Sequence, residues 1–296
     1  MSTAPAPPSE YRTRVWIGSL MALLTAGVLV ADHHVALWLA RPVYPFLIVF
    51  VALLVALSVA ELYALLAAHP RPPLWLVLSS CLAVSLAALP ALLGGREASA
   101  WRDMAAVFAL AVLAGFLWEM AAFREPGGVV PRLALLTWMT AYLGLLPSFF
   151  VQIRFRPAES APLAGVASLA LVIFVPKCCD IGAYVTGRAF GRTRMTPLLS
   201  PKKTWEGLAG GLALSVAVAV LLNRAVTEVL RSDAEAALFG LVLGLTGVLG
   251  DLAESMIKRD CQKKDASQAV PGFGGVLDVV DSVLFAAPVA YLWLAT

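Results

Sequence analysis

Residues 250–282 read GDLAESMIKRDCQKKDASQAVPGFGGVLDVVDS. They hold ten charged side chains, in a chain of 296 residues of which only 14% are charged. Carboxylates stand at both ends of this stretch, inside two runs that otherwise have the composition of membrane helices, and a basic loop with Gly and Pro lies between them. A charge inside a membrane is costly and marks a functional site by default. We expect the rest of the chain to be the scaffold that holds this stretch in place.

The composition around this stretch is that of an integral membrane protein. Sixty percent of the residues are apolar, whereas a soluble domain is nearer half apolar and a quarter charged. Helices satisfy every backbone group within lipid, and about 20 apolar residues suffice to span it. We predict an all-α polytopic bundle of about nine transmembrane helices. The predicted spans are residues 14–31, 44–66, 74–93, 104–122, 132–153, 163–187, 207–223, 236–257 and 276–295.

The chain divides into three parts by its chemistry. Residues 1–13, with the Pro-rich head MSTAPAPPSE, are predicted to be a short disordered tail. Residues 14–160 carry little chemistry and are predicted to be transmembrane scaffold helices. Within them, Glu61 and Glu119 are each interpreted as snorkelling or pairing with a neighbouring helix, in preference to a functional role. Residues 161–296 are predicted to be the catalytic transmembrane region.

The distribution of Lys and Arg predicts the orientation. With the N-terminus inside, the inner segments hold fourteen of these residues and the outer loops seven. Positive charge favours the cytoplasmic side. Most of the bias comes from residues 188–203 and 258–264, which also contain candidate binding residues. We predict a multi-pass protein of the cell (inner) membrane, with its active site facing the cytoplasm.

Two helix faces carry the acidic side chains of residues 250–282. The end of the eighth span presents four polar side chains at helical spacing, namely Asp251, Glu254, Ser255 and Lys258. The ninth span begins with Asp278 and Asp281, again on one face. If the loop between them folds back, the two faces meet near the inner membrane surface. Carboxylates without an equal number of basic groups need a cation, and oxygen-only ligands of this kind suit Mg²⁺.

Residues 177–207 are the predicted second wall of this site. Pro176 is expected to kink the sixth span or to leave a carbonyl free. Lys177 and Asp180 either neutralise each other or line a polar cleft that opens to the inside. The loop 195–211, MTPLLSPKKTWEGLAGG, sets lysines beside hydroxyls close to a helix start, an arrangement that favours anions. The alternative interpretation is an ordinary positive-inside loop, in which the Thr and the Glu cap the following helix. The Walker spacing of P-loop proteins is absent.

A metal site with basic residues at the lipid surface predicts phosphoryl or nucleotidyl transfer on a lipid. The alternative of a different class is a cation-coupled transporter, in which the carboxylates form a cation path. Such a transporter favours discontinuous helices in two repeated halves, and this sequence has no corresponding half. The Trp residues suit an interfacial aromatic belt rather than base stacking, so we expect no nucleic-acid partner.

The pattern S-x-[apolar]-K-R-x4-K-D-x-[small]…P-G-x-G-G-[apolar]-x-D-x-[apolar]-D, over residues 255–281, closely resembles that of phosphatidate cytidylyltransferases, also called CDP-diacylglycerol synthases. The segment DIGAYVTGRAFGRTRMTPLLSPKKTWEGLAGG, residues 180–211, looks like the other block of this family. The sequence departs from the family at Phe273, where His is frequent, and at Val279, where Arg is frequent. The metal carboxylates are intact, which predicts that activity is retained.

The resemblance implies that CTP and phosphatidate react to give CDP-diacylglycerol and pyrophosphate, with Mg²⁺ and with or without a second cation. It also implies membrane lipid as a partner and a homodimer. The nearest enzymatic alternative is a CTP-dependent polyprenol or dolichol kinase. The implied catalytic residues are Asp251, Asp281 and Lys258. The implied metal ligands are Asp251, Asp278 and Asp281. The implied substrate-binding residues are Asp180, Ser200, Lys202, Lys203, Thr204, Glu206, Ser255, Arg259 and Lys264.

Overall fold

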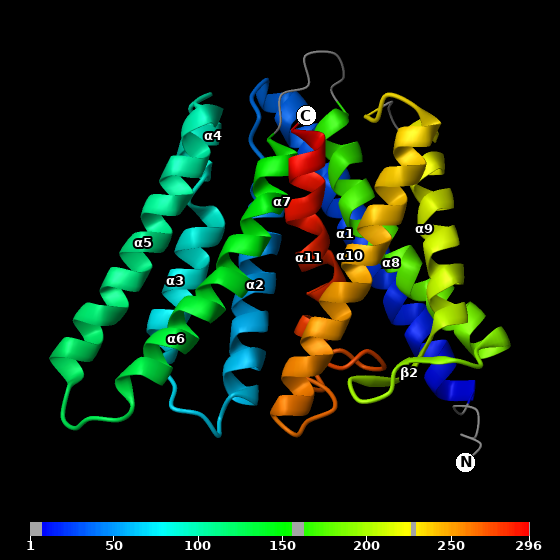
Figure 1. The fold of residues 1–296 in the computed structure, drawn as a ribbon. Coiled ribbons are helices and arrows are strands. Elements are labelled where there is room, and N and C mark those ends of the chain that lie inside the picture. The colour runs from blue at the N-terminus through cyan, green and yellow to red at the C-terminus, as the bar shows by residue number, and fades with distance from the viewer. Residues whose placement is uncertain (1–7, 156–162, 226–228, 296) are drawn as a thin grey trace.

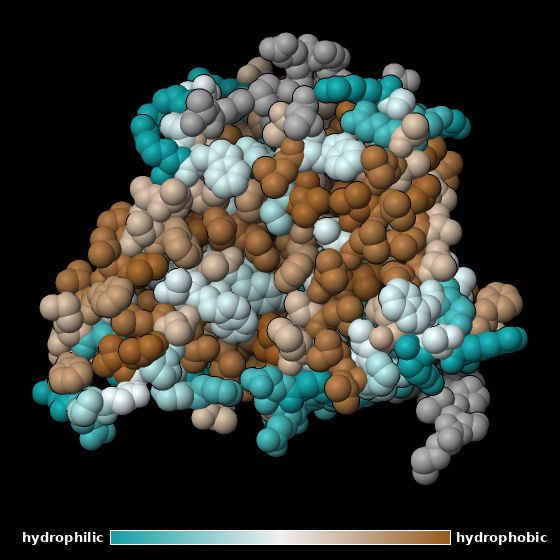
Figure 2. Space-filling view, viewed as in Figure 1, coloured by the Kyte–Doolittle hydropathy of each residue, from teal (hydrophilic) through white to brown (hydrophobic). Residues whose placement is uncertain are grey.

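The helices stand side by side as a membrane bundle (Figure 1). The computed structural model describes residues 8–155, 163–225 and 229–295. Within these ranges, nine helices are long and apolar enough to cross a membrane. On the face shown in Figure 2, apolar residues form a broad band, and hydrophilic residues gather at its upper and lower ends. The predicted all-α, multi-pass bundle is confirmed.

The N-terminal part supplies five of these spans. Its elements are α1 (Pro8–Leu39), α2 (Pro45–Leu65), α3 (Leu74–Leu86), α4 (Leu89–Leu93), α5 (Glu97–Ala122), α6 (Val129–Thr140), the π-helical turn η1 (Ala141–Leu145) and α7 (Leu146–Arg154). The elements α3 and α4 together make one span, and α6, η1 and α7 make another. Helix α1 begins at Pro8, so residues 8–13, which were predicted as part of the tail, are helical. Residues 1–7 lie outside the described residues.

The C-terminal part supplies the other four spans. Its elements are α8 (Ala164–Phe190), β1 (Arg194–Thr196), β2 (Ser200–Thr204), α9 (Trp205–Ala225), α10 (Asp233–Asp260) and α11 (Val276–Leu294). The segment predicted as the loop 195–211 is therefore largely structured. Its first part is an antiparallel hairpin in which Arg194 pairs with Thr204 and Thr196 with Ser200. Its second part already belongs to α9.

Two polar features of the predicted spans have structural explanations. Helix α8 continues through Pro176, and the missing N–H at this residue leaves the carbonyl of Val172 without its helical donor. Glu119 of α5 accepts hydrogen bonds from Arg132 of α6, the shortest at 2.6 Å between Oε2 and Nη2. The prediction that Glu119 pairs with a neighbouring helix is confirmed.

One end of the bundle gathers two connections of the C-terminal part, that between α8 and α9 and that between α10 and α11. The hairpin, the loop 261–275 between α10 and α11, and the beginning of α1 all lie at this end, whereas the C-terminus lies at the opposite end (Figure 1). Helix α10 packs against α9 and α11 along the bundle. The carboxyl-terminal turns of α10 and the first turns of α11 therefore meet where the hairpin crosses.

Candidate active site

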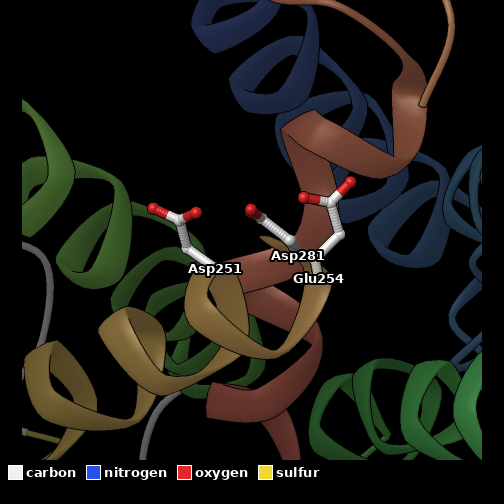
Figure 3. A group of neighbouring side chains, drawn as sticks. All are labelled: Asp251, Glu254 and Asp281. Atoms are coloured by element: carbon white, nitrogen blue, oxygen red, sulfur yellow. The ribbon is translucent and has the colours of Figure 1, made fainter. Parts of the chain in front are cut away.

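Three carboxylates converge between α10 and α11. Asp251 and Glu254 come from α10 and Asp281 from α11, and one oxygen of each lies within 4.8 Å of the others (Figure 3). Glu254 and Asp281 are buried, with exposed fractions of 0% and 4%, whereas Asp251 is partly exposed. The two helices come this close because Gly250 has no side chain: a Cβ there would lie 2.5 Å from the backbone oxygen of Asp281. The acidic group is thus buried at Glu254 and Asp281 and partly open at Asp251.

Lysines surround this group without balancing its charge. Lys203 of β2 places Nζ 2.7 Å from Asp251 Oδ2. Lys177 of α8 places Nζ 3.5 Å from Asp281 Oδ1 and 3.4 Å from Asp180 Oδ2. The predicted Lys177–Asp180 pair is therefore present, and it extends to a third residue on another helix. Lys177 and Lys203 keep about a quarter to a third of their side chains exposed, at 30% and 23%.

Lys258 is the most buried of the three lysines. Its ammonium contacts Glu254 on its own helix and Asp278 on α11. Only 9% of its side chain is exposed. Removing one partner from such a buried pair leaves an uncompensated charge, so each member depends on the others. Lys258 thus ties the end of α10 to the beginning of α11.

The residues fit a divalent cation. Across the ion pairs, five carboxylates face three ammonium groups, a formal excess of two negative charges. Oε1 of Glu254 is buried and has no hydrogen-bond partner among the residues that the structure describes. An unmatched buried carboxylate oxygen is costly. Asp251, Glu254 and Asp281 offer the oxygen-only ligand set that suits a hard cation such as Mg²⁺.

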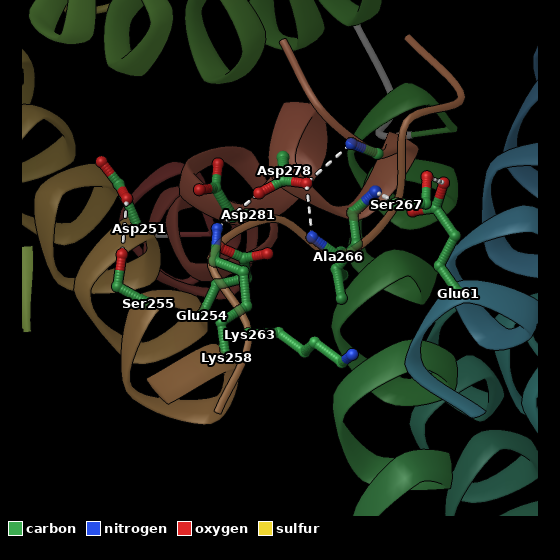
Figure 4. A network of polar contacts seen from close by, with 12 residues as sticks. Glu61, Asp251, Glu254, Ser255, Lys258, Lys263, Ala266, Ser267, Asp278 and Asp281 are labelled. Atoms are coloured by element: carbon green, nitrogen blue, oxygen red, sulfur yellow. Dashed lines mark hydrogen bonds and ion pairs between the residues drawn. The ribbon is translucent and has the colours of Figure 1, made fainter. Parts of the chain in front are cut away.

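Asp278 occupies a different position from the other predicted ligands. Its Oδ2 accepts hydrogen bonds from the backbone N–H of Gly275 at 2.6 Å and of Ala266 at 3.1 Å, and its Oδ1 faces Lys258 (Figure 4). It therefore caps α11 and closes the preceding loop. The group that could hold a metal contains Glu254 in place of Asp278. The spacing of Glu254 from Asp251 on one helical face was the signal for it, although no ligand role was predicted.

The hairpin residues divide between capping and contact with the acidic group. Thr204 caps α9, because its Oγ1 accepts a hydrogen bond from Gly207 N at 3.1 Å. Glu206 accepts hydrogen bonds from the backbone of Arg192 at 3.1 Å and of Thr193 at 3.2 Å. The contact of Thr204 matches the capping alternative, whereas Glu206 binds the backbone before the hairpin, and the substrate-binding role of both residues stays a prediction. Within the described hairpin, Lys203 is the residue with an ion pair to the acidic group.

The remaining predicted binding residues lie around this group. Ser255 donates a long hydrogen bond, 3.4 Å, to Asp251 Oδ1. Arg259 donates to the backbone oxygens of Leu199 at 3.3 Å and of Lys263 at 3.0 Å, and so connects the hairpin to the loop 261–275. Ser200 is half-buried at the beginning of β2, and Lys202 and Lys264 are exposed. These basic residues give the end of the bundle that carries the acidic group a positive rim.

One carboxylate from the N-terminal part also reaches this region. Glu61 of α2 accepts hydrogen bonds from Ser267 and from the backbone of Val276 and Leu277 (Figure 4). The prediction that Glu61 pairs with a neighbouring helix is confirmed, and the helix is α11. No pattern within the sequence indicates this partner, because more than 200 residues separate the two.

The family follows from comparison with known sequences. Residues 14–296 match the cytidylyltransferase family. This chain belongs to the cytidylyltransferase family. The predicted resemblance is thereby confirmed, and it covers all the residues of the acidic group. The hydrophobic first half, which carried no recognised motif, belongs to the family as well.

Several curated relatives bear the name phosphatidate cytidylyltransferase. That of Haemophilus influenzae is 37% identical over 159 residues, which cover 52% of this chain and 55% of the relative. That of a Synechocystis species is 38% identical over 178 residues, covering 52% and 59%. That of Pseudomonas aeruginosa is 40% identical over 136 residues, covering 45% and 50%. The matched part of this chain thus spans between half and three-fifths of the length of these relatives.

Proposed function

We propose that this protein transfers the cytidylyl group of CTP to phosphatidate and releases pyrophosphate, giving CDP-diacylglycerol for phospholipid synthesis. Membership of the cytidylyltransferase family supports the transfer, and the names of the relatives support the lipid acceptor. The observation that carries the proposal is the buried group of Asp251, Glu254 and Asp281 at one end of a membrane bundle. It provides a place for a nucleotide–metal complex beside the lipid.

The reaction needs little covalent help from the protein. An oxygen of the phosphatidate phosphate attacks the α-phosphorus of CTP, and the bond from that phosphorus to the oxygen that bridges to the β-phosphate breaks. Pyrophosphate carries away the electron pair of the broken bond. The attacking phosphate is already largely ionised near neutral pH, so no strong general base is required. Catalysis therefore depends on positioning and on the stabilisation of negative charge.

Asp251, Glu254 and Asp281 would hold Mg²⁺, with or without a second cation. When bound, Mg²⁺ would neutralise phosphate oxygens of CTP and make the α-phosphorus more electrophilic. The lysines have distinct roles. Lys177 and Lys203 are partly exposed and can turn toward substrate phosphates. Lys258 is too enclosed for that, and its ion pair holds Glu254 in place.

The exposed basic residues would collect both acidic substrates. Lys202, Arg259 and Lys264 surround the end of the bundle at which the acidic group lies, and Ser200 and Asp180 would help to orient the substrates. We place this end in the cytoplasm and the protein in the inner membrane, on the basis of the Lys and Arg distribution. Phosphatidate would then enter from the inner leaflet. A homodimer, which the family resemblance implies, belongs to the same proposal.

The proposal is tested with the purified protein in mixed micelles that contain phosphatidate, CTP and Mg²⁺. We expect CDP-diacylglycerol and pyrophosphate in equal amounts, and no product when the Mg²⁺ is chelated. The same preparation in liposomes is tested for cation flux. Absence of product together with cation flux would overturn the enzymatic proposal in favour of the transporter.

A further inference from the structure

Glu61 connects the N-terminal helices to the helix that carries Asp281. This half-buried residue of α2 uses both carboxylate oxygens. Oε1 accepts hydrogen bonds from Ser267 Oγ at 2.6 Å and from Val276 N at 2.9 Å, and Oε2 accepts one from Leu277 N at 2.8 Å (Figure 4). One side chain therefore holds both the loop before α11 and the first turn of α11.

The contact satisfies a specific need of α11. The first N–H groups of a helix have no partner inside the helix, and the positive end of the helix dipole attracts a carboxylate. Val276 and Leu277 are the first two residues of α11. Among the N–H groups at this end of α11, Asp278 accepts a hydrogen bond from that of Gly275, the residue before the helix. Glu61, which belongs to another helix, thus accepts the hydrogen bonds of the N–H groups of α11 that Asp278 does not reach.

The approach of Glu61 depends on a glycine of the family pattern. A Cβ at Gly275 would lie 2.5 Å from Glu61 Oε2, closer than real Cβ atoms come to other heavy atoms. The close neighbour of Gly275 is thus a carboxylate of the protein itself.

We infer that Glu61 is a positioning residue, which fixes the first turn of α11 so that Asp281 stays beside Asp251 and Glu254. Asp281 lies four residues after Leu277, about one helical turn further along α11. A shift of the first turn would move Asp281 relative to α10 and would strain the Lys258–Asp278 contact. The effect on catalysis rests on the proposed function, whereas the effect on α11 does not.

The chain offers a matched control for this inference. Glu119 is also a carboxylate of the N-terminal helices, and it is 4% exposed. Its partner is Arg132 of α6, and no contact joins it to α11 in the described structure. Glu119→Gln therefore reports the general cost of neutralising a paired carboxylate in the membrane. Glu61→Gln and Glu61→Ala report that cost together with the loss of the cap.

The structural arm measures hydrogen exchange in the full-length wild type and in the three variants, without substrates. We expect the peptide that contains Val276 and Leu277 to exchange at least tenfold faster in Glu61→Ala, and less so in Glu61→Gln. The same peptide should be unchanged in Glu119→Gln. Equal protection of this peptide in the wild type and in Glu61→Ala would overturn the inference. This arm gives its answer even if the protein has no cytidylyltransferase activity, so the two proposals fail separately.

The kinetic arm separates positioning from a loss of folded protein. We expect Glu61→Gln to lower kcat at least tenfold and to raise the Mg²⁺ concentration for half-maximal rate, with the KM for phosphatidate unchanged. Glu61→Asp should recover part of kcat, because it can still accept hydrogen bonds from the amides. A kcat in Glu61→Gln equal to that in Glu119→Gln, per folded molecule, would contradict the positioning role.

Discussion

Replacing Asp281 by Asn is the sharpest perturbation of the acidic group. The change keeps the shape of the side chain and removes one negative charge. The Oδ1 of Asn can still accept the hydrogen bond from Ser282 N, which is 2.5 Å long in the structure. Lys177 keeps Asp180 as a partner at 3.4 Å, so no buried ammonium is left alone. The variant should therefore fold.

The expected change in folding stability on Asp281→Asn follows from the charges around Asp281. With an effective dielectric constant of about 20, two unit charges no more than 4.8 Å apart interact by about 3.5 kcal/mol or more. Asp281 is repelled to this extent by both Asp251 and Glu254. Its attraction to Lys177 at 3.5 Å amounts to about 5 kcal/mol on the same scale. Without metal, the thermal stability of Asp281→Asn should accordingly equal or exceed that of the wild type.

The expected effect of Asp281→Asn on catalysis is a loss, in contrast to its effect on stability. Loss of a residue that merely supports a metal ligand typically costs 10- to 100-fold in affinity or activity. A ligand itself should cost at least 100-fold in kcat, or about 2.7 kcal/mol of activation free energy. The assay is CDP-diacylglycerol formation against Mg²⁺ concentration, combined with thermal unfolding with and without Mg²⁺. Retention of more than a tenth of wild-type kcat, or an undiminished rise in stability with Mg²⁺, would refute the metal role of Asp281.

Three further predictions follow from the contacts around the acidic group. Lys203→Gln removes the ion-pair partner of Asp251 and should lower kcat/KM for CTP about tenfold or more. The unfolding free energy should change little, because the pair is partly exposed. A kcat/KM equal to that of the wild type would contradict this role of Lys203. Lys258→Met leaves buried carboxylates unpaired and should lower the unfolding free energy by about 3 kcal/mol or more, measured by denaturant titration in detergent. Gly250→Ala should cost about 1–3 kcal/mol through overpacking, whereas Gly27→Ala, where a Cβ has no atom within 4 Å, should be neutral or slightly stabilising.

The transmembrane architecture was predictable because the membrane imposes it on composition. Every span must be apolar over about 20 residues, and each predicted run coincides with an observed span apart from shifts at its ends. The hairpin before α9 was not predicted, since a two-stranded element of three and five residues has almost no periodic signal. Pro176 is expected to kink its helix or to leave a carbonyl free, and the second holds: α8 continues through Pro176, and the carbonyl of Val172 lacks its helical donor.

The candidate site was predictable to the extent that it lies on helical faces. The spacing of Asp251 and Glu254, and of Asp278 and Asp281, predicts that each pair shares a helical face, and these two faces meet in the structure. Helical spacing does not distinguish a carboxylate that could bind a metal from one that caps its helix. Asp278 is so close to the beginning of α11 that its carboxylate accepts a hydrogen bond from Gly275 N. Contacts between distant parts of the chain, such as that of Glu61 with Leu277, have no periodicity within one sequence and needed the structure.

We propose above that the acidic group serves cytidylyl transfer to a lipid. The most direct measurement follows a label placed on either the α- or the γ-phosphate of CTP, with phosphatidate as the acceptor and Mg²⁺ present. We predict that the α-label enters the lipid fraction and the γ-label leaves as pyrophosphate, and that Asp281→Asn abolishes both transfers. Appearance of the γ-label in the lipid would instead identify a kinase and would contradict this account.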